Sequence, residues 1–261
     1  MTDTDPLNIG LLLCDDVAPE DQPQYGTYAD MFQNSLDPDA RSIVLTPIRC
    51  FEGERLPAPE RYEGYVISGS RYGVYENQSW IKQLMQFVRD CWDQRVKVVG
   101  ICFGHQLIAH ALGGKTVKAD AGWGFGIQSV KVTEKQPWMT GFGNLDGGHY
   151  NLVVIHQDQV VEMPPHFRSI AENDFCPNSM IIGGNTMLGI QGHPEFGKEF
   201  CAFRAEFRKE TIGQEVYEST LQSLAENDLH ARAILDWVNN FLHQAKGTDP
   251  DSGRTQLDPA S

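Results

Sequence analysis

The amino-terminal half of the chain alternates short apolar runs with segments in which apolar residues recur at helical spacing. Continuous apolar runs of this kind are typical of strands buried on both faces of a parallel sheet. They lie at residues 8–14, 41–48, 64–70 and 96–101. Between them, residues 28–36 and 80–92 carry apolar side chains three and four positions apart, which predicts amphipathic helices. This alternation predicts an α/β fold with a doubly wound, mostly parallel sheet and flanking helices.

The pattern changes after residue 115, where shorter strand-like runs are separated by turns. We expect the sheet to continue there with some antiparallel strands. The runs lie at residues 116–119, 127–132, 151–156, 169–172 and 187–192, and helices are predicted at 200–208, 216–224 and 229–242. We predict one domain over residues 1–245, in which 197–245 form a helical extension that packs on the domain or caps a partner interface. The polar residues 246–261 predict a disordered tail.

Composition narrows the classes of function. The chain has 261 residues and a formal net charge of −14, without a cluster of lysine and arginine, which argues against a nucleic-acid partner. An apolar run approaching the roughly 20 residues of a membrane span is absent from the sequence, so no membrane association is expected. The six cysteines show no paired spacing, and the amino terminus is acidic and polar. We therefore expect reduced thiols and a cytoplasmic protein.

The fourth apolar run leads directly into the sequence Gly100-Ile101-Cys102-Phe103-Gly104, which a helix-forming segment follows. The spacing Gly-x-Cys-x-Gly is the thiol version of the nucleophile elbow, a sharp turn from strand to helix. At the amino terminus of a helix, unpaired N–H groups and the helix dipole favour a thiolate over a thiol. We predict that Cys102 is a nucleophile; the alternative is a buried cysteine that closes a parallel strand.

A second motif, Gly192-His193-Pro194-Glu195-Phe196, closes the last strand-like run. A thiolate nucleophile needs a base that can also protonate the leaving group, and a group that orients this base. Pro194 favours an extended conformation at His193, and side chains two positions apart in an extended segment point the same way. The sequence therefore predicts that His193 and Glu195 meet and act with Cys102 as a catalytic triad.

Other histidines and glycine-rich segments give weaker signals. His105 and His110 lie five positions apart on the elbow helix, a poor spacing for two metal ligands on one face, so we interpret them as packing residues. Residues 122–126 have the glycine content of a phosphate-binding loop but lack the following Lys-Ser/Thr, and a turn is predicted there. We expect neither a metal nor a cofactor.

Taken together, three motifs resemble the class-I glutamine amidotransferases, which use a Cys–His–Glu triad. The motifs are residues 100–106, 192–195 and 68–70. The resemblance covers about residues 8–200. The stretches 67–76 and 113–126 look most like the amidotransferase portion of GMP synthases and its stand-alone relatives, which include γ-glutamyl peptidases. The resemblance implies the α/β fold with a mostly parallel sheet that the apolar pattern also predicts.

The resemblance also implies roles for individual residues. Cys102 would attack a γ-glutamyl carbonyl, His193 would pass the thiol proton to the leaving amine or ammonia, and water would hydrolyse the thioester. The backbone N–H groups of Ser70 and Phe103 would form the oxyanion hole. Substrate contacts are implied for Gly69, Gln106, His156, Gln157 and Asp158. This chain departs from the family pattern by having Ser70 and Arg71 where a glycine and a proline are common, and Gln157 where a glycine is common.

The resemblance leaves three functions open. The chain would be a glutaminase that releases ammonia to a separate synthase subunit, or a self-contained γ-glutamyl peptidase. Both act on a small-molecule substrate, glutamine or another γ-glutamyl compound. A non-catalytic regulatory protein on the same fold is the third hypothesis, and its expected mark is a missing triad member, whereas Cys102, His193 and Glu195 are all present.

Overall fold

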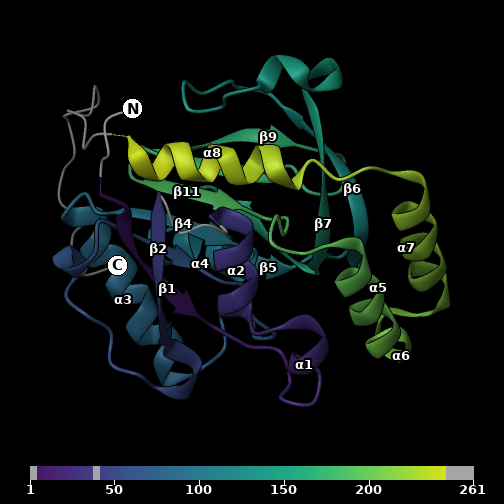
Figure 1. Cartoon of the computed structure of the whole chain (residues 1–261), viewed down its shortest axis with the longest axis horizontal. Helices are drawn as coiled ribbons and strands as arrows, with labels where there is room; N and C mark the ends of the chain where they lie inside the picture. The colour runs from purple at the N-terminus through teal and green to yellow at the C-terminus, as the bar shows by residue number, and fades with distance from the viewer. Residues whose placement is uncertain (1–4, 38–41, 245–261) are drawn as a thin grey trace.

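The computed structural model describes residues 5–37 and 42–244, so the tail predicted at 246–261 lies outside the described residues. Its centre is a nine-stranded sheet (Figure 1). The strands are β1 (Leu7–Leu13), β2 (Ile43–Arg49), β3 (Gly64–Ile67), β4 (Lys97–Ile101), β6 (Gly124–Val132), β7 (His149–His156), β9 (Phe167–Glu172), β10 (Met180–Gly183) and β11 (Met187–Ile190). Their order is β2-β1-β3-β4-β11-β10-β9-β6-β7. A separate antiparallel pair joins β5 (Lys115–Lys118) to β8 (Asp158–Glu162).

The sheet has a parallel and an antiparallel part. Strands β2, β1, β3, β4 and β11 are parallel, and β10, β9, β6 and β7 continue the sheet with antiparallel pairs. Every residue of β3 and β4 is buried, as the continuous apolar runs predict. Strand β2, which contains Pro47, is one of the two edge strands. The predicted α/β fold, mostly parallel with some antiparallel strands, is confirmed.

The antiparallel part differs from the prediction in detail. Strands β8 and β10 are not among those that the sequence analysis predicts. The turn predicted at 122–126 is wrong from Gly124 onward, where β6 begins and pairs with β7. A Cβ atom at Gly126 would lie 2.4 Å from Oγ of Ser223, so this glycine reflects close packing of a helix on the strand.

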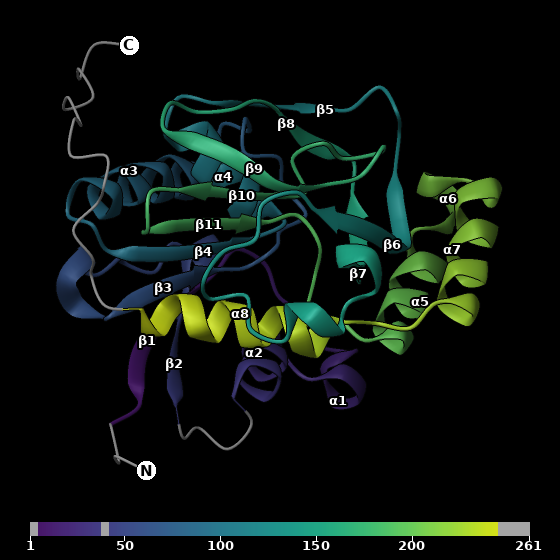
Figure 2. The same ribbon diagram turned by 90° about the horizontal axis from the view of Figure 1, so that it is seen from above.

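Helices cover both faces of the sheet, as Figure 2 shows. Helices α3 (Ser79–Asp93) and α4 (Phe103–Ala111) lie on one face, and α2 (Tyr28–Leu36) and α8 (Ala231–His243) lie on the other. The remaining α-helices of the described residues are α1 (Gln22–Tyr25), α5 (Lys198–Phe207), α6 (Lys209–Ile212) and α7 (Gln214–Glu226). Helices α5, α6 and α7 gather at the end of the molecule formed by β6 and β7. Within the described part of the chain, every helix is too short or too polar to span a membrane.

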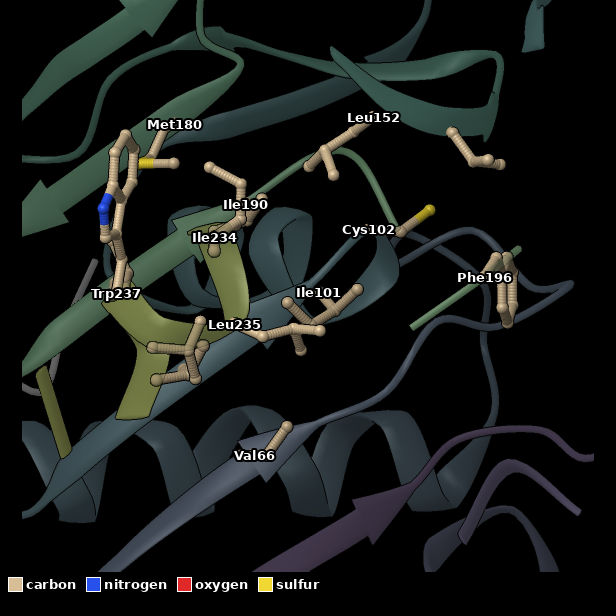
Figure 3. Close-up of a cluster of buried hydrophobic side chains, with 14 of the residues drawn as sticks. Val66, Ile101, Cys102, Leu152, Met180, Ile190, Phe196, Ile234, Leu235 and Trp237 are labelled. Atoms are coloured by element: carbon tan, nitrogen blue, oxygen red, sulfur yellow. The ribbon is translucent and has the colours of Figure 1, made fainter. Parts of the chain in front are cut away.

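Helix α8 supplies much of the core on its face of the sheet. Ile234, Trp237 and Phe241 are fully buried there, and Figure 3 shows Trp237 beside Met180 and Ile234 beside Ile190 of the sheet. The indole N–H of Trp237 donates to the carbonyl of Thr140 at 2.7 Å. The helical extension at 197–244 thus packs on the sheet. Cys102 and Phe196 lie at one end of the same apolar cluster.

Candidate active site

The elbow has the geometry that its glycines require. Strand β4 ends at Ile101, and α4 begins at Phe103, so Cys102 makes the whole turn. Its φ of 52° and ψ of −99° are rarely adopted by a residue with a side chain, which makes this a strained position held by its surroundings. A Cβ atom at Gly100 would lie 2.3 Å from the backbone of Gly104. Only glycine therefore allows strand and helix to approach so closely here.

The second motif brings His193 and Glu195 into contact, although its backbone differs from the prediction. Nδ1 of His193 lies 2.7 Å from Oε1 of Glu195. The segment does not stay extended: the N–H of Phe196 donates to the carbonyl of His193 at 3.4 Å, which closes a turn with Pro194 at its second position. The turn stacks the rings of His193 and Phe196 with centroids 4.3 Å apart. This stacking fixes the plane of the imidazole.

The environment of His193 favours its charged form. Burial by itself would lower the pKa of His193, but the negative charges of Glu195 and Cys102 and hydrogen bonds with both side chains raise it well above its usual range. At neutral pH the imidazole therefore holds a proton between a carboxylate and a sulfur atom. Sγ of Cys102 also lies 3.9 Å from the carbonyl of Ile155. The arrangement is suited to an imidazolium–thiolate pair.

The loop after β3 is tied to the end of β1. The hydroxyl of Ser68 accepts from the N–H of Cys14 at 2.9 Å, and the hydroxyl of Ser70 donates to the carbonyl of Cys14 at 2.8 Å. The N–H of Arg71 donates to Asp15 at 3.0 Å, and its guanidinium binds the same buried carboxylate through Nε and Nη2. Ser70 and Arg71, two of the three departures from the family pattern, thus anchor this loop together with Ser68.

The backbone around the loop lies close to the predicted triad. A Cβ atom at Gly69 would lie 2.9 Å from Cε1 of His193 and 3.8 Å from Cβ of Cys102, so Gly69 packs directly against both. Ser70 lines the same pocket as Cys102. The side chain of Phe103 is buried against Trp80, with ring centroids 5.7 Å apart, and its amide is in the first turn of α4. The backbone of Phe103, not its ring, is therefore the part next to the sulfur.

Cys102 opens on a pocket of about 210 Å³. The structure brings five residues with implied substrate or oxyanion roles to its wall: Ser70, Gln106, His156, Gln157 and Asp158. Residues that the sequence analysis did not assign to the site also line it, among them Tyr75, Lys118 and Arg208. The wall therefore carries both a carboxylate and cations, a combination that fits a substrate with an amino and a carboxyl group.

Hydrogen bonds hold this wall in place. Nε2 of Gln106 donates to the carbonyl of Asp158 at 2.9 Å and to Oε1 of Gln191 at 3.1 Å. Nδ1 of His156 lies 3.1 Å from the same carbonyl, and burial lowers the pKa of His156 to about 4, so its ring is neutral. The hydroxyl of Tyr75 donates to the carboxylate of Asp158 at 3.1 Å. The residues that would touch a substrate are thus preorganised.

Several residues at the site escaped the sequence analysis for different reasons. Asp15 follows the first strand, and the rule that sites form at the carboxyl ends of parallel strands could have identified it. Arg204 and Arg208 line cavities at Cys102, but their positions depend on how α5 is oriented, which no local pattern encodes. His105 is interpreted as a packing residue in the sequence analysis, and its side chain is fully buried. It packs against Gly189, where a Cβ atom would lie 2.6 Å from Nδ1 of His105.

Comparisons with known proteins agree with this geometry. The family model described as glutamine amidotransferase class-I matches residues 41–199. Gamma-glutamyl peptidase 5 of Arabidopsis thaliana is 34% identical over 179 residues, which cover 67% of this chain and 70% of that protein. GMP synthase [glutamine-hydrolyzing] of Trichormus variabilis is 30% identical over 134 residues, 51% of this chain and 23% of that protein.

The fold is also found among solved structures. The crystal structure of a glutamine amidotransferase from Thermotoga maritima aligns with a TM-score of 0.69 and 17% identity, covering 91% of this chain and 99% of that one. At this identity the alignment shows the fold alone, and the matching family model and the peptidase relative show the family. The chain therefore belongs to the class-I glutamine amidotransferase family and is a cysteine hydrolase of amide bonds.

Proposed function

We propose that the protein hydrolyses the amide bond of a γ-glutamyl compound through a thioester on Cys102, and that it does so alone, as a γ-glutamyl peptidase. The observation that carries this proposal is the arrangement of Cys102, His193 and Glu195 beside a pocket with charges of both signs. The similarity to gamma-glutamyl peptidase 5 favours the self-contained version. Release of ammonia to a separate synthase subunit is the second candidate, which the similarity to a GMP synthase supports.

The triad performs the reaction in two halves. The Cys102 thiolate attacks the γ-carbonyl carbon, and when the tetrahedral adduct collapses the C–N bond breaks while His193 gives its proton to the leaving nitrogen. In the second half His193 removes a proton from water, the hydroxide attacks the thioester, and the C–S bond breaks to restore the thiolate. Glu195 orients His193 and stabilises its cationic form in both halves.

Both tetrahedral adducts carry a negative oxygen that needs hydrogen-bond donors. We assign this role to the backbone N–H groups of Ser70 and Phe103. Support comes from the anchored loop after β3, which packs Gly69 on His193, and from the position of Phe103 at the start of α4. One such donor lowers the barrier by about 3–4 kcal/mol in enzymes where it has been removed.

The pocket of about 210 Å³ would hold the glutamyl part of the substrate. The carboxylate of Asp158 and the side chain of Gln157 suit the α-ammonium group, and Lys118 suits the α-carboxylate. Gln106 and His156 position the backbone of Asp158 and border the same space. A cytoplasmic location stays a proposal, which the six unpaired and buried cysteine thiols support.

Steady-state hydrolysis by the purified protein tests the proposal. We expect turnover of γ-glutamyl dipeptides without any added protein, and slower release of ammonia from L-glutamine. Turnover of L-glutamine that is stimulated by a partner, with dipeptides left intact, would contradict the peptidase version. A protein that hydrolyses neither compound would contradict γ-glutamyl hydrolysis altogether.

A further inference from the structure

Cys102 also lines a second, smaller cavity, whose other lining residues differ from those of the pocket described above. His193 lines this cavity and not the larger pocket, whereas Gln106 and Asp158 line only the larger pocket. The leaving nitrogen must receive its proton from His193. In a substrate whose glutamyl part occupies the larger pocket, the leaving group therefore points into the second cavity.

The second cavity carries two arginines from the carboxyl-terminal segment. Arg204 lies in α5, and Arg208 caps the end of this helix one turn later, with its N–H donating to the carbonyl of Arg204 at 3.1 Å. Both side chains are half-buried and line the cavity together with Tyr28 and Asp15. Helix α5 begins directly after the His193–Glu195 turn, so the turn itself brings the two arginines to the sulfur.

Neither arginine forms an ion pair with an acid in the described parts of the chain. The guanidinium of Arg208 lies over the ring of Trp123, with Cζ 5.5 Å from the centroid, and that of Arg204 lies 5.3 Å over Phe207. The acid beside them, Asp15, is already bound by Arg71. Burial, and next the charge of Arg204, lower the pKa of Arg208. Like charges four positions apart on a helix repel each other, so the pair is unfavourable without an anion.

We propose that Arg204 and Arg208 bind a carboxylate on the leaving group, so that the preferred substrates are γ-glutamyl peptides with a free carboxyl terminus. This inference rests on the proposed function and specifies its substrate class. Two guanidinium groups beside the scissile bond would bind the carboxylate of the departing amino acid or peptide through charge-assisted hydrogen bonds. Glutamine, which loses only ammonia, cannot make these contacts.

A matched pair of substrates isolates this contact: γ-glutamylglycine and γ-glutamylglycinamide, which differ only in the terminal carboxylate. We expect the wild-type protein to show a kcat/KM about 10- to 100-fold higher for the free acid, the range that charge-assisted hydrogen bonds supply. In Arg204→Gln and Arg208→Gln the ratio between the two substrates should fall toward one. Lys209→Gln, which removes a positive charge next to Arg208 but outside both cavities, should keep the wild-type ratio.

The outcomes separate this inference from the proposed function. Hydrolysis of both substrates at equal rates by the wild-type protein would overturn the carboxylate subsite and leave γ-glutamyl hydrolysis standing. So would an unchanged ratio in both arginine variants. Failure of the wild-type protein to hydrolyse either substrate or L-glutamine would overturn the proposed function itself. The wild-type ratio needs no variant, so the test does not depend on how the variants fold.

Discussion

The elbow and helix α5 both border Cys102, but the sequence encodes them in different ways. The elbow is a local structure, since Gly100, Cys102 and Gly104 lie within five positions and their spacing alone defines the turn. Helix α5 reaches the same sulfur only because the chain has first built the whole sheet. The position of the nucleophile is therefore encoded locally, whereas the arginines that we propose to select the substrate are placed by the whole fold.

The largest expected effect comes from the elbow nucleophile. Cys102→Ala should lower kcat by at least about 10⁴-fold, because no other group at the site can form the thioester. Cys91→Ala, which removes a buried thiol from α3, is the matched control and should keep turnover near the wild-type value. Hydrolysis rates of the two purified variants provide the measurement, and undiminished turnover by Cys102→Ala would refute the thioester.

A smaller loss, about 10³- to 10⁴-fold in kcat, is expected from Glu195→Gln, since the amide no longer stabilises the charged imidazole. The Glu195 charge helps to raise the pKa of His193, so its removal should lower that pKa. The imidazolium is then lost at a lower pH, and the alkaline limb of the profile of kcat/KM against pH should move down the pH scale. A limb that stays in place would show that Glu195 does not act on His193.

The two regions can also be compared through their glycines. Gly104→Ala would place a Cβ atom 2.5 Å from the carbonyl oxygen of Ile67, and we expect it to lower the free energy of unfolding by about 1–3 kcal/mol. Gly197→Ala, at the start of α5, adds its Cβ to open space with an ordinary φ of −86° and should change stability little. Urea unfolding of both variants measures the difference, and equal stability would contradict the packing described for the elbow.

The smallest effect on activity is expected from breaking the pair of Arg71 and Asp15, which holds the loop after β3. Arg71→Met should lower kcat/KM by up to about tenfold, because the Arg71 side chain is 59% exposed and solvent weakens its pair with Asp15. Arg168→Met breaks a similarly exposed pair with Glu134 far from the site and should leave kcat/KM unchanged. A larger loss in the first variant would give Arg71 a direct role in substrate binding.

The sequence predicts the residues of the triad better than it predicts the residues and strands around them. The Cys102 and His193 motifs and the parallel strands follow from local spacing and apolar runs. Strands β8 and β10 are not among the predicted strands. Gly124 packs against Phe175 and Gly126 against α7, and no local pattern encodes these contacts between segments distant in sequence. Arg208 reaches Cys102 only in the folded chain, because its position depends on how α5 is oriented, so its place in the site required the structure.

The most direct test of the account is the mass of the protein after treatment with a diazoketone analogue of glutamine. Such an electrophile reports both the nucleophile and the γ-glutamyl pocket, because it must bind before it reacts. We predict one adduct per chain, located on Cys102 by peptide mapping and prevented by an excess of a γ-glutamyl dipeptide. An unmodified protein, or an adduct on one of the other five cysteines, would contradict the central claim that Cys102 attacks a γ-glutamyl group.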